Sequence, residues 1–134
     1  MAKYKKKLDA DIRCPLEYGL TIFGGKSGEY PQKLYKALMN SQTVLTVWDD
    51  ARLVGLIRVL DDSEMLAQIH YVLVHPEYQG RGIAGRMVEY IKEKYKNFMY
   101  LELMPKDKNN VPFYEKHGFH VMENGAAMQI CNIN

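Results

Sequence analysis

The sequence predicts a mixed α/β fold in which helices cover the faces of a β-sheet. Residues 43–60 are rich in β-branched and aromatic side chains and are interrupted by Asp49-Asp50, a pattern that indicates a hairpin. Residues 83–96 repeat apolar side chains at the spacing of an amphipathic helix. Residues 98–103 then return to the alternation of a strand. This order of strands and helices favours one sheet with helices on its faces.

The length and composition are those of one domain. The chain has 134 residues and a mass of 15.5 kDa, and 47% of its residues are hydrophobic and 25% charged. These values exclude a disordered chain, a collagen-like chain and a two-domain enzyme. We therefore expect a single domain over residues 1–134.

The charge and the cysteines bear on partners and location. A net charge of +2 is too small to indicate nucleic-acid binding by itself. No stretch approaches the roughly 20 apolar residues of a membrane span. Cys14 and Cys131 lie far apart and have no metal-ligand partners at useful spacing. With no signal-like apolar run at the start, we expect reduced thiols in a cytoplasmic protein, with neither a metal, a membrane nor a nucleic acid as partner.

The N-terminal part combines a basic start with one helix. The lysines at positions 3, 5, 6 and 7 fit a basic arm for an acidic partner or a charged edge strand, and we favour the edge strand. A helix is predicted from Pro31 onward, with Leu34 and Leu38 on the same face.

The remaining elements follow from turn residues and periodicity. A long strand is expected from about Met65 to Val74, with an end, Val72–Val74, that is apolar on both faces and therefore central and well covered. A short helix has Pro112 in its first turn and Gly118 at its C-terminal cap. Two last strands are expected around Phe119–Met122 and Ala126–Cys131.

Two glycine-rich segments suggest phosphate binding. The first, Gly24-Gly25-Lys26-Ser27, has Leu20 where a P-loop requires its first glycine, so a plain turn explains it better. The second, Gly80-Arg81-Gly82-Ile83-Ala84-Gly85, matches G-x-G-x-x-G between a strand and a helix, with Glu102 at the place of a ribose-binding acid. Residues 75–79 separate these glycines from the strand, and residues 103–134 are too few to complete a dinucleotide fold. The dinucleotide interpretation is therefore a minor alternative.

The second segment has a simpler physical interpretation. Small residues at the start of a helix expose backbone N–H groups beside the positive end of the helix dipole. Arg81 and Arg86 add positive charge beside them. A mere connection between strand and helix rarely requires so many small residues together. The sequence therefore predicts a cradle for an anion such as pyrophosphate.

The chain resembles the GNAT superfamily of N-acetyltransferases at two motifs. Residues 72–84, VLVHPEYQGRGIA, match the acetyl-CoA loop pattern Gln/Arg-x-x-Gly-x-Gly/Ala at Gln79, Gly82 and Ala84. Residues 113–119, FYEKHGF, look like the second signature of the family. The resemblance covers about residues 43–131. It implies a mixed, mostly antiparallel central sheet of six to seven strands with a splayed pair, flanked by about four helices.

The resemblance implies acetyl-CoA as the acetyl donor. The pantetheine arm would pair with the strand end Val72–Val74, and the pyrophosphate would lie on the amides of residues 79–85. The thioester would lie between the strands that end at Val74 and Leu103. The implied cofactor-binding residues are Val72, Leu73, Val74, Gln79, Gly80, Arg81, Gly82, Ile83, Ala84, Gly85 and Asn110.

The resemblance also implies direct transfer of the acetyl group. A deprotonated amine attacks the thioester carbonyl while a backbone amide near Leu73 stabilises the oxyanion. Tyr114 occupies the position of the family's tyrosine that protonates the departing thiolate, and a phenol with a reference pKa of about 10 can donate that proton. The alternative is that Tyr114 is a core aromatic that packs like Phe113 and Phe119.

Two positions depart from the family pattern. Asp107 stands where the family often has an asparagine, while Asn109 and Asn110 are nearer to Tyr114, and Asn110 also suits a helix N-cap. Tyr71 stands where a carboxylate general base is common. The remaining candidate bases are His70, His75, Glu77 and Glu102.

The leading prediction is an N-acetyltransferase that acts on a primary amine of a small molecule or of a protein. The alternative, from another class, is a noncatalytic acyl-CoA-binding or regulatory module of the same fold. A nucleic-acid-binding protein lacks the expected interleaving of basic and aromatic residues. The sequence leaves the acceptor and the oligomeric state open, and a homodimer is one assembly that it allows.

Overall fold

The computed structural model describes the backbone of residues 3–6 and all of residues 29–133. The chain divides into two compact units, Met1–Leu103 and Met104–Asn134. The first unit carries the sheet and the second glycine segment, and the second unit carries the short helix that contains Tyr114.

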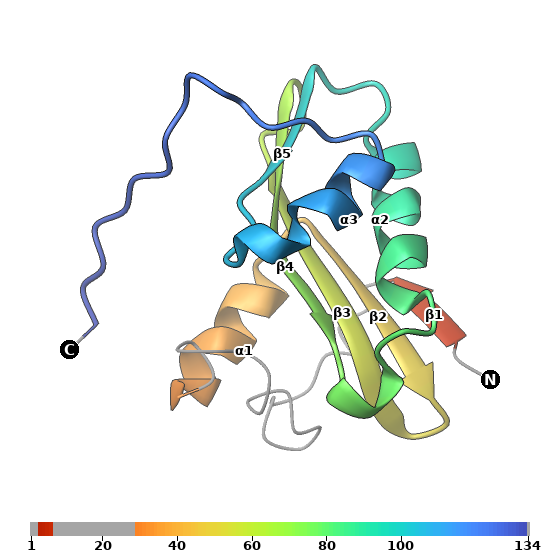
Figure 1. Ribbon diagram of the computed structural model, residues 1–134. Coiled ribbons are helices and arrows are strands. Elements are labelled where there is room, and N and C mark those ends of the chain that lie inside the picture. The colour runs from red at the N-terminus through yellow and green to blue at the C-terminus, as the bar shows by residue number, and fades with distance from the viewer. Residues whose placement is uncertain (1–2, 7–28, 134) are drawn as a thin grey trace. The chain divides into compact units, whose positions relative to one another are not determined.

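Five strands of the described residues form one sheet in the order β1-β2-β3-β4-β5 (Figure 1). Neighbours from β1 to β4 are antiparallel, whereas β4 and β5 are parallel. A parallel pair needs a crossover connection, and α2 (Ile83–Lys94) supplies it. The strands are β1 (Lys3–Lys6), β2 (Thr43–Asp49), β3 (Arg52–Asp61), β4 (Leu66–Val74) and β5 (Tyr100–Leu103).

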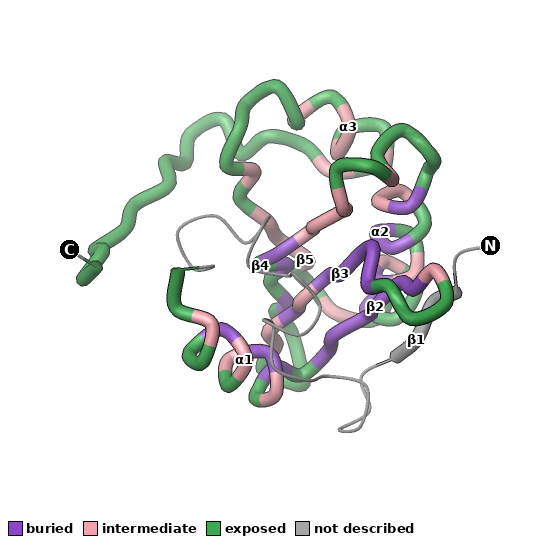
Figure 2. The backbone as a smooth tube through the Cα atoms, turned by 90° about the horizontal axis from the view of Figure 1, so that it is seen from below, coloured by how far each residue is buried: buried purple, intermediate pink, exposed green. Residues whose placement is uncertain are grey.

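The predicted hairpin is confirmed as β2 and β3. Its turn contains Asp50, whose φ of +51° is the left-handed conformation that aspartate tolerates in a turn. Most residues of both strands are buried, because helices cover both faces of the sheet here. Figure 2 shows this buried stretch running through β2 and β3 and into β4.

The predicted helix from Pro31 is confirmed as α1 (Pro31–Met39), and it covers one face of the sheet. Leu34 and Leu38 are buried in a cluster with Leu56 of β3 and Tyr71 of β4. The two leucines therefore lie on one face of α1, as the sequence predicts, and that face is buried.

The amphipathic helix is confirmed as α2, which covers the other face. Its buried residues are Ile83, Met87, Val88 and Ile91. A Cβ on Gly55 of β3 would lie 3.1 Å from the Ile83 side chain. Since successive strand residues point to opposite faces, Gly55 lies under α2 and the next residue, Leu56, lies under α1.

The edge strand predicted for the lysine-rich start is observed as β1. Lys3–Lys6 pairs antiparallel with β2 at the edge of the sheet. The fourth lysine of the run, at position 7, lies outside the described residues.

The expectation that the end of β4 is well covered is wrong. Burial alternates along the first part of β4, and Val72, Leu73 and Val74 are only half-buried. The reason is the length of the parallel pairing, because β5 pairs with β4 only from Leu66 to Ile69. The end of β4 therefore has a strand neighbour on one side only among the described residues.

The second unit contains the predicted short helix but not the predicted last strands. α3 covers Val111–Lys116 and follows a 3-10 turn, Lys108–Asn110. Residues 119–133 contain no strand. The β-branched and apolar residues of this segment are largely exposed, and Met128 and Ile130 are 93% and 89% exposed. Apolar alternation indicated strands there, but no described strand pairs with the segment and gives it a ladder.

Several expectations are not confirmed or lie outside the described residues. The described chain has five strands and three α-helices, so six to seven strands and about four helices are not confirmed. The segment Gly24-Gly25-Lys26-Ser27 and Cys14 lie in the part that is not described, while Cys131 is a free, exposed thiol. No helix of residues 29–133 is long and apolar enough to cross a membrane.

Candidate functional site

The loop between β4 and α2 depends on two glycines with positive φ. Gly80 and Gly82 have φ of +78° and +80°, which side chains other than glycine rarely adopt. A Cβ built on either glycine would meet nothing within 4 Å. Packing therefore does not demand glycine here, but the backbone conformation does. The space beside both residues is open to a ligand as far as the described residues are concerned.

The start of α2 presents uncapped amides. Gly82 is the N-cap, and no side chain of the described residues caps the helix. The Gly82 carbonyl accepts the first helical hydrogen bond, from the Arg86 amide at 3.1 Å. The N–H groups of the first turn therefore have no helical acceptor, and the helix dipole adds partial positive charge beside them. These are the properties of the anion cradle that the sequence predicts.

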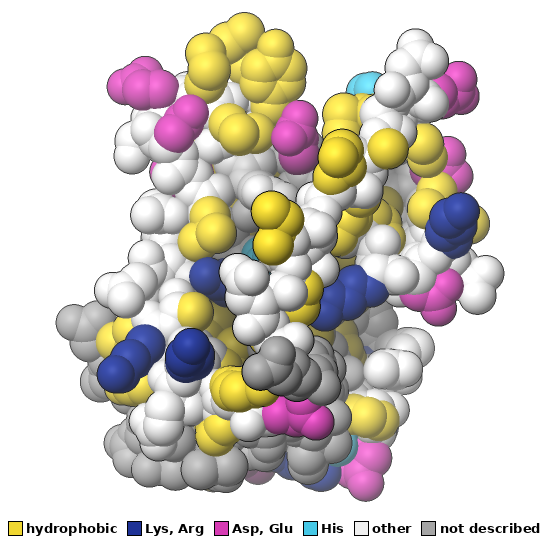
Figure 3. Space-filling model, turned by 90° about the vertical axis from the view of Figure 1, so that its left-hand side faces the viewer, with side chains coloured by type: hydrophobic (Ala, Val, Ile, Leu, Met, Phe, Trp, Pro, Cys, Tyr) yellow, Lys and Arg dark blue, Asp and Glu magenta, His cyan; other side chains and the backbone are white. Residues whose placement is uncertain are grey.

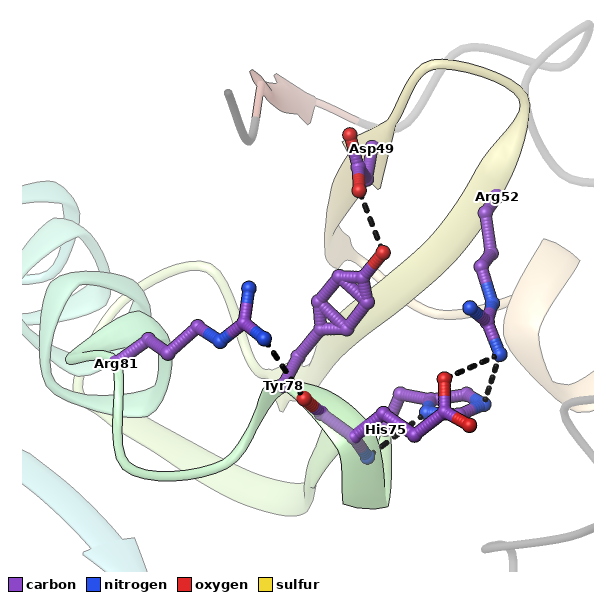
Figure 4. A network of polar contacts seen from close by, with 6 residues as sticks. Asp49, Arg52, His75, Tyr78 and Arg81 are labelled. Carbon is purple, nitrogen blue, oxygen red and sulfur yellow. Dashed lines mark hydrogen bonds and ion pairs between the residues drawn. The ribbon is translucent and has the colours of Figure 1, made fainter.

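The loop is held against the turn of the β2–β3 hairpin (Figure 4). Tyr78 donates a short hydrogen bond to Asp49 Oδ2. Arg52 forms an ion pair with Glu77 at 3.0 Å. The Arg81 guanidinium lies 4.8 Å from the centre of the Tyr78 ring and donates to the Glu77 carbonyl at 3.1 Å. These contacts fix the loop that carries the glycines.

The Tyr78 hydroxyl donates a hydrogen bond to Asp49 and keeps its proton at neutral pH. Its hydrogen bond to Asp49 raises the pKa of Tyr78 above the ordinary tyrosine value, and desolvation raises it further. The phenol therefore stays protonated at neutral pH. The Tyr78–Asp49 bond belongs to the scaffold of the loop.

Strand β4 carries a bulge where its pairing with β5 ends. Arg58 of β3 pairs with Tyr71, whereas Val59 pairs with Ile69, so His70 is the extra residue of β4. The last parallel pair is Ile69 with Leu103. A bulge bends its strand. The parallel pairing therefore stops next to the bulge, at the end of β5, near the place where the resemblance implies a splayed pair.

The hydrogen-bond pattern shows which backbone groups point away from β3. The His75 amide donates to the Val54 carbonyl at 2.8 Å, and bonded pairs alternate along an antiparallel ladder. Leu73 therefore faces β3, while Val72 and Val74 present their backbone groups to the side where β5 has ended. Gln79 Nε2 lies 3.3 Å from the Val74 carbonyl, which agrees with this direction. The amides of Val72 and Val74, and not that of Leu73, therefore point to the open side of β4.

Tyr114 lies in the middle of α3, in the second unit. Its ring is half-buried and lies 5.0 Å from the Phe113 ring and 6.0 Å from the Phe119 ring. Burial raises the pKa of Tyr114 above the ordinary tyrosine value. The phenol is therefore protonated at neutral pH, which is the state that a proton donor needs.

Gly118 ends α3 as predicted. It adopts φ of +91°, its amide donates to the Glu115 carbonyl, and the Phe119 amide donates to the Tyr114 carbonyl. This pair of bonds is the Schellman motif, which favours glycine at the first position after the cap. The motif fixes the last turn of α3, and with it the backbone of Tyr114.

The asparagines and Asp107 before α3 differ from expectation. Asn110 stands at the N-cap position of α3, but its side chain makes no capping hydrogen bond. Asp107 instead caps the preceding 3-10 turn, accepting from the Asn109 amide at 2.9 Å. The carboxylate in place of the family's asparagine therefore has a local structural role.

The candidate bases differ in what surrounds them. His75 Nδ1 accepts from the Glu77 amide, and Arg52 lies 3.1 Å from Nε2. Glu77 is itself paired with Arg52. A base needs a lone pair that the substrate can reach. His75 and Glu77 therefore make contacts that hold the loop, whereas Glu102 lies half-buried on β5 opposite Gln68.

His70 contacts a residue that sequence reasoning did not single out. Arg58 Nη1 lies 2.6 Å from His70 Nδ1. A guanidinium only donates, so Nδ1 must accept, and the neutral ring then carries its proton on Nε2. Only the periodicity of β3 could have indicated Arg58, since it places a charged side chain on a strand face that is otherwise apolar.

The residues that the resemblance implies for the site thus belong to two units, each described by itself. The first unit brings together the end of β4, the glycine loop and the start of α2. Tyr114 and Asn110 belong to the second unit. The β4–β5 pairing that ends at a bulge, followed by a helix that begins behind two glycines, is an arrangement suited to an extended ligand with an anionic group.

Comparison with known proteins gives the family. The model of the acetyltransferase (GNAT) family matches residues 16–119, so the chain belongs to this family. Over 78 residues the chain is 27% identical to the peptidyl-lysine N-acetyltransferase YiaC of Escherichia coli, covering 58% of this chain and 50% of that protein. The chain spans about half the length of the curated relatives it matches.

Solved structures agree with the fold. A crystal structure of a protein of unknown function from meticillin-resistant Staphylococcus aureus, a probable acetyltransferase, is 28% identical with a TM-score of 0.83 and covers 98% of this chain and 99% of that one. A predicted acetyltransferase from Clostridium acetobutylicum, solved with acetyl-CoA, is 16% identical with a TM-score of 0.70 and covers 96% of both chains. The chain therefore has the fold of this family.

Proposed function

We propose that the protein is an acetyl-CoA-dependent N-acetyltransferase that moves the acetyl group directly to a primary amine of a small molecule or a protein. The observation that carries the proposal is the uncapped start of α2 behind Gly80 and Gly82, next to the unpaired edge of β4. Membership of the acetyltransferase (GNAT) family supports it.

The residues of the first unit fit acetyl-CoA. When bound, this donor supplies a thioester whose carbonyl is attacked by the acceptor amine. The amides at the start of α2 bind the pyrophosphate, and Arg81 adds charge beside them. Val72 and Val74 hold the extended arm through their outward backbone groups and one of their amides stabilises the oxyanion.

We assign the proton transfer to Tyr114 Oη. The phenol is protonated at neutral pH because burial raises its pKa. It gives its proton to the thiolate as the carbon–sulfur bond breaks, and the proton that the amine loses returns to solvent. The second family motif, residues 113–119, supports this role.

The named relatives bear on the donor and the acceptor. The Clostridium acetobutylicum structure contains acetyl-CoA, which supports the choice of donor. The Escherichia coli relative is a peptidyl-lysine N-acetyltransferase, which keeps protein amines among the candidate acceptors. Both facts belong to those proteins and enter here as support for the class of reaction.

A single assay tests the proposal. The purified chain is incubated with acetyl-CoA and a panel of small amines and lysine peptides, and free CoA thiol is measured. We expect thiol release that depends on both the protein and one class of amine. Tight acetyl-CoA binding without release for any amine would instead support the noncatalytic acyl-CoA-binding module.

A further inference from the structure

Arg58 is a half-buried cation whose described contacts are a serine hydroxyl, a histidine ring and a tyrosine ring. Its Nε donates to Ser41 Oγ at 2.7 Å, and its Nη1 lies 2.6 Å from His70 Nδ1. The guanidinium lies 5.8 Å from the centre of the Tyr71 ring. Among the residues that the structure describes, Arg58 has no carboxylate partner and its Nη2 has no hydrogen bond.

An arginine in this state lacks the compensation that buried charges usually have. Removing a guanidinium from water is costly unless an anion offsets the loss. Here burial lowers the pKa of Arg58, and the electrostatic effect of Tyr71 offsets only part of this shift. The planar fork of a guanidinium fits a carboxylate or a phosphate with paired hydrogen bonds. An anionic group brought by a ligand would supply the missing partner.

The position of Arg58 relates this anion to the reaction. Arg58 pairs with Tyr71 and lies beside the bulge at His70, where the β4–β5 pairing ends. Arg58 and Leu56 are two residues apart on β3, so both lie on the face of the sheet that α1 covers. This face is opposite to α2 and its uncapped amides. Figure 3 shows the side of the molecule that carries α1, where Lys and Arg side chains lie beside hydrophobic ones. The guanidinium therefore lies near the end of the β4–β5 pairing, on the face of the sheet opposite α2.

We propose that Arg58 is the specificity residue that binds an acidic group of the acceptor. The acceptor is then a small amine that carries a carboxylate or a phosphate, such as an amino acid, and not the side chain of a lysine within a protein. This inference rests on the proposed N-acetyltransferase function. Ser41 and His70 orient the guanidinium through its Nε and Nη1, which leaves Nη2 and the outer edge of the fork for the acid.

The contacts of Ser41 show why the fork is held in place. Ser41 Oγ donates to the Ala37 carbonyl at 2.6 Å, at the end of α1, while it accepts from Arg58. The last turn of α1 and the bulge of β4 therefore hold Arg58 from two sides. A side chain that is held in advance loses less entropy when it binds an anion.

Matched pairs of acceptors test the proposal. Glycine, β-alanine and serine are compared with glycinamide, β-alaninamide and serinamide, and ethanolamine phosphate is compared with ethanolamine. We expect kcat/KM to favour the acid of each preferred pair by about ten- to a hundredfold, mostly through KM. The amide pairs and the phosphate pair distinguish a carboxylate acceptor from a phosphate acceptor. A lysine peptide that exceeds every acid would overturn the proposal.

Arg58→Gln removes the charge but keeps a donor for Ser41 or His70. We expect the acid-to-amide ratio of kcat/KM to fall toward one in this variant and to recover in part in Arg58→Lys. Lys33→Gln removes one charge from the exposed side of α1 and should leave the ratio unchanged. An acid preference that persists in Arg58→Gln would contradict the proposal.

A binding experiment keeps the test independent of turnover and of the folding of Arg58→Gln. Calorimetry with the same amino acids and amides is performed on the wild-type chain and on Arg58→Lys. We expect the acids to bind at least tenfold more tightly than their amides to the wild type. Equal affinity would refute the assignment of Arg58. An absence of acetyl transfer with retained acid preference would instead refute the proposed function alone.

Discussion

Tyr114 is the residue on which the proposed proton transfer depends. Tyr114→Phe keeps the ring and its contacts with Phe113 and Phe119 but removes the proton of the hydroxyl. We expect kcat to fall about 10²–10⁴-fold, the usual effect of losing a general acid. The melting temperature and the affinity for acetyl-CoA should change little, because the apolar burial is retained.

The exposed Tyr30 provides the control for this substitution. Tyr30→Phe should leave the turnover as it is in the wild type. Full turnover in Tyr114→Phe would remove Tyr114 from the mechanism and make water the proton donor. A variant that loses stability instead would show that the hydroxyl holds the fold.

Some features of single residues are predictable from the sequence, and others are not. The motif around Gln79, Gly82 and Ala84 predicted the loop, because glycine at positive φ is a local requirement. The contact of Tyr78 with Asp49 joins residues 29 apart in the sequence, and that of Arg58 with His70 joins residues 12 apart. Such pairs depend on strand register and on a bulge, which no local pattern indicates.

At the scale of elements, the start of α2 is the feature that we propose as the anion site. Ala84 lies in its first turn and is half-buried. Ala84→Leu places a bulky side chain beside the uncapped amides, so we expect the Kd for acetyl-CoA to rise at least about tenfold, or about 1.4 kcal/mol. Calorimetry measures the affinity and circular dichroism the fold. Ala51→Leu, in the exposed hairpin turn, should bind as the wild type does.

Unchanged affinity in a folded Ala84→Leu would mean that the pyrophosphate does not lie on the start of α2. Gly82→Val is a less clear test, because its φ of +80° strains any side chain whatever the space. A loss of binding in that variant could come from the backbone alone. Comparing the acetyl-CoA affinities of the two variants distinguishes a blocked anion site from a strained backbone in the turn.

The end of α2 is joined to the hairpin by a buried tyrosine. The Tyr95 hydroxyl donates to Asp61 Oδ2 at 2.6 Å and lies 2.6 Å from Thr43 Oγ1. Burial and then the hydrogen bond to Asp61 raise the pKa of Tyr95 to about 12. The unfolded value is about 10, so the native state keeps a proton that the unfolded chain loses between these pH values. The stabilisation is complete below about pH 10 and is lost as the pH rises toward 12.

Tyr95→Phe tests this dependence. We expect the free energy of unfolding near neutral pH to fall by about 1–3 kcal/mol, because Asp61 and Thr43 lose a buried partner. The difference between wild type and variant should shrink when urea unfolding is repeated near pH 11. Tyr100→Phe, at an exposed tyrosine of β5, should change neither value. A difference that is independent of pH would show that Tyr95 does not titrate as described.

The elements differ in how well the sequence predicts them. The hairpin and α2 have strong periodicity and local turn residues, and the structure confirms them. The strands expected at 119–122 and 126–131 also alternate, yet alternation indicates a strand only where a partner strand is present. The end of β4 is less buried than the sequence predicts, because its apolar residues lie beyond the point where the pairing with β5 stops. A run of apolar residues has the same sequence pattern whether or not a neighbouring strand covers it.

At the scale of the whole molecule, the family membership and the geometry of the first unit support one account. The β4–β5 pairing ends beside the His70 bulge, α2 begins behind the glycine loop on one face of the sheet, and Arg58 lies on the other face. The sequence predicts the loop through its motif but not the bulge or the arginine. We propose that the donor and the acceptor reach the end of the β4–β5 pairing from these two opposite faces.

The most direct measurement is transfer of an isotopically labelled acetyl group. The chain is incubated with labelled acetyl-CoA and the preferred amine, and the product, free CoA and intact protein are weighed by mass spectrometry. We expect label on the amine, an equal amount of free CoA, and no label on the protein, because the proposed transfer is direct. Label that remains on acetyl-CoA with every amine, or that accumulates on the protein as an acyl-enzyme, would contradict it.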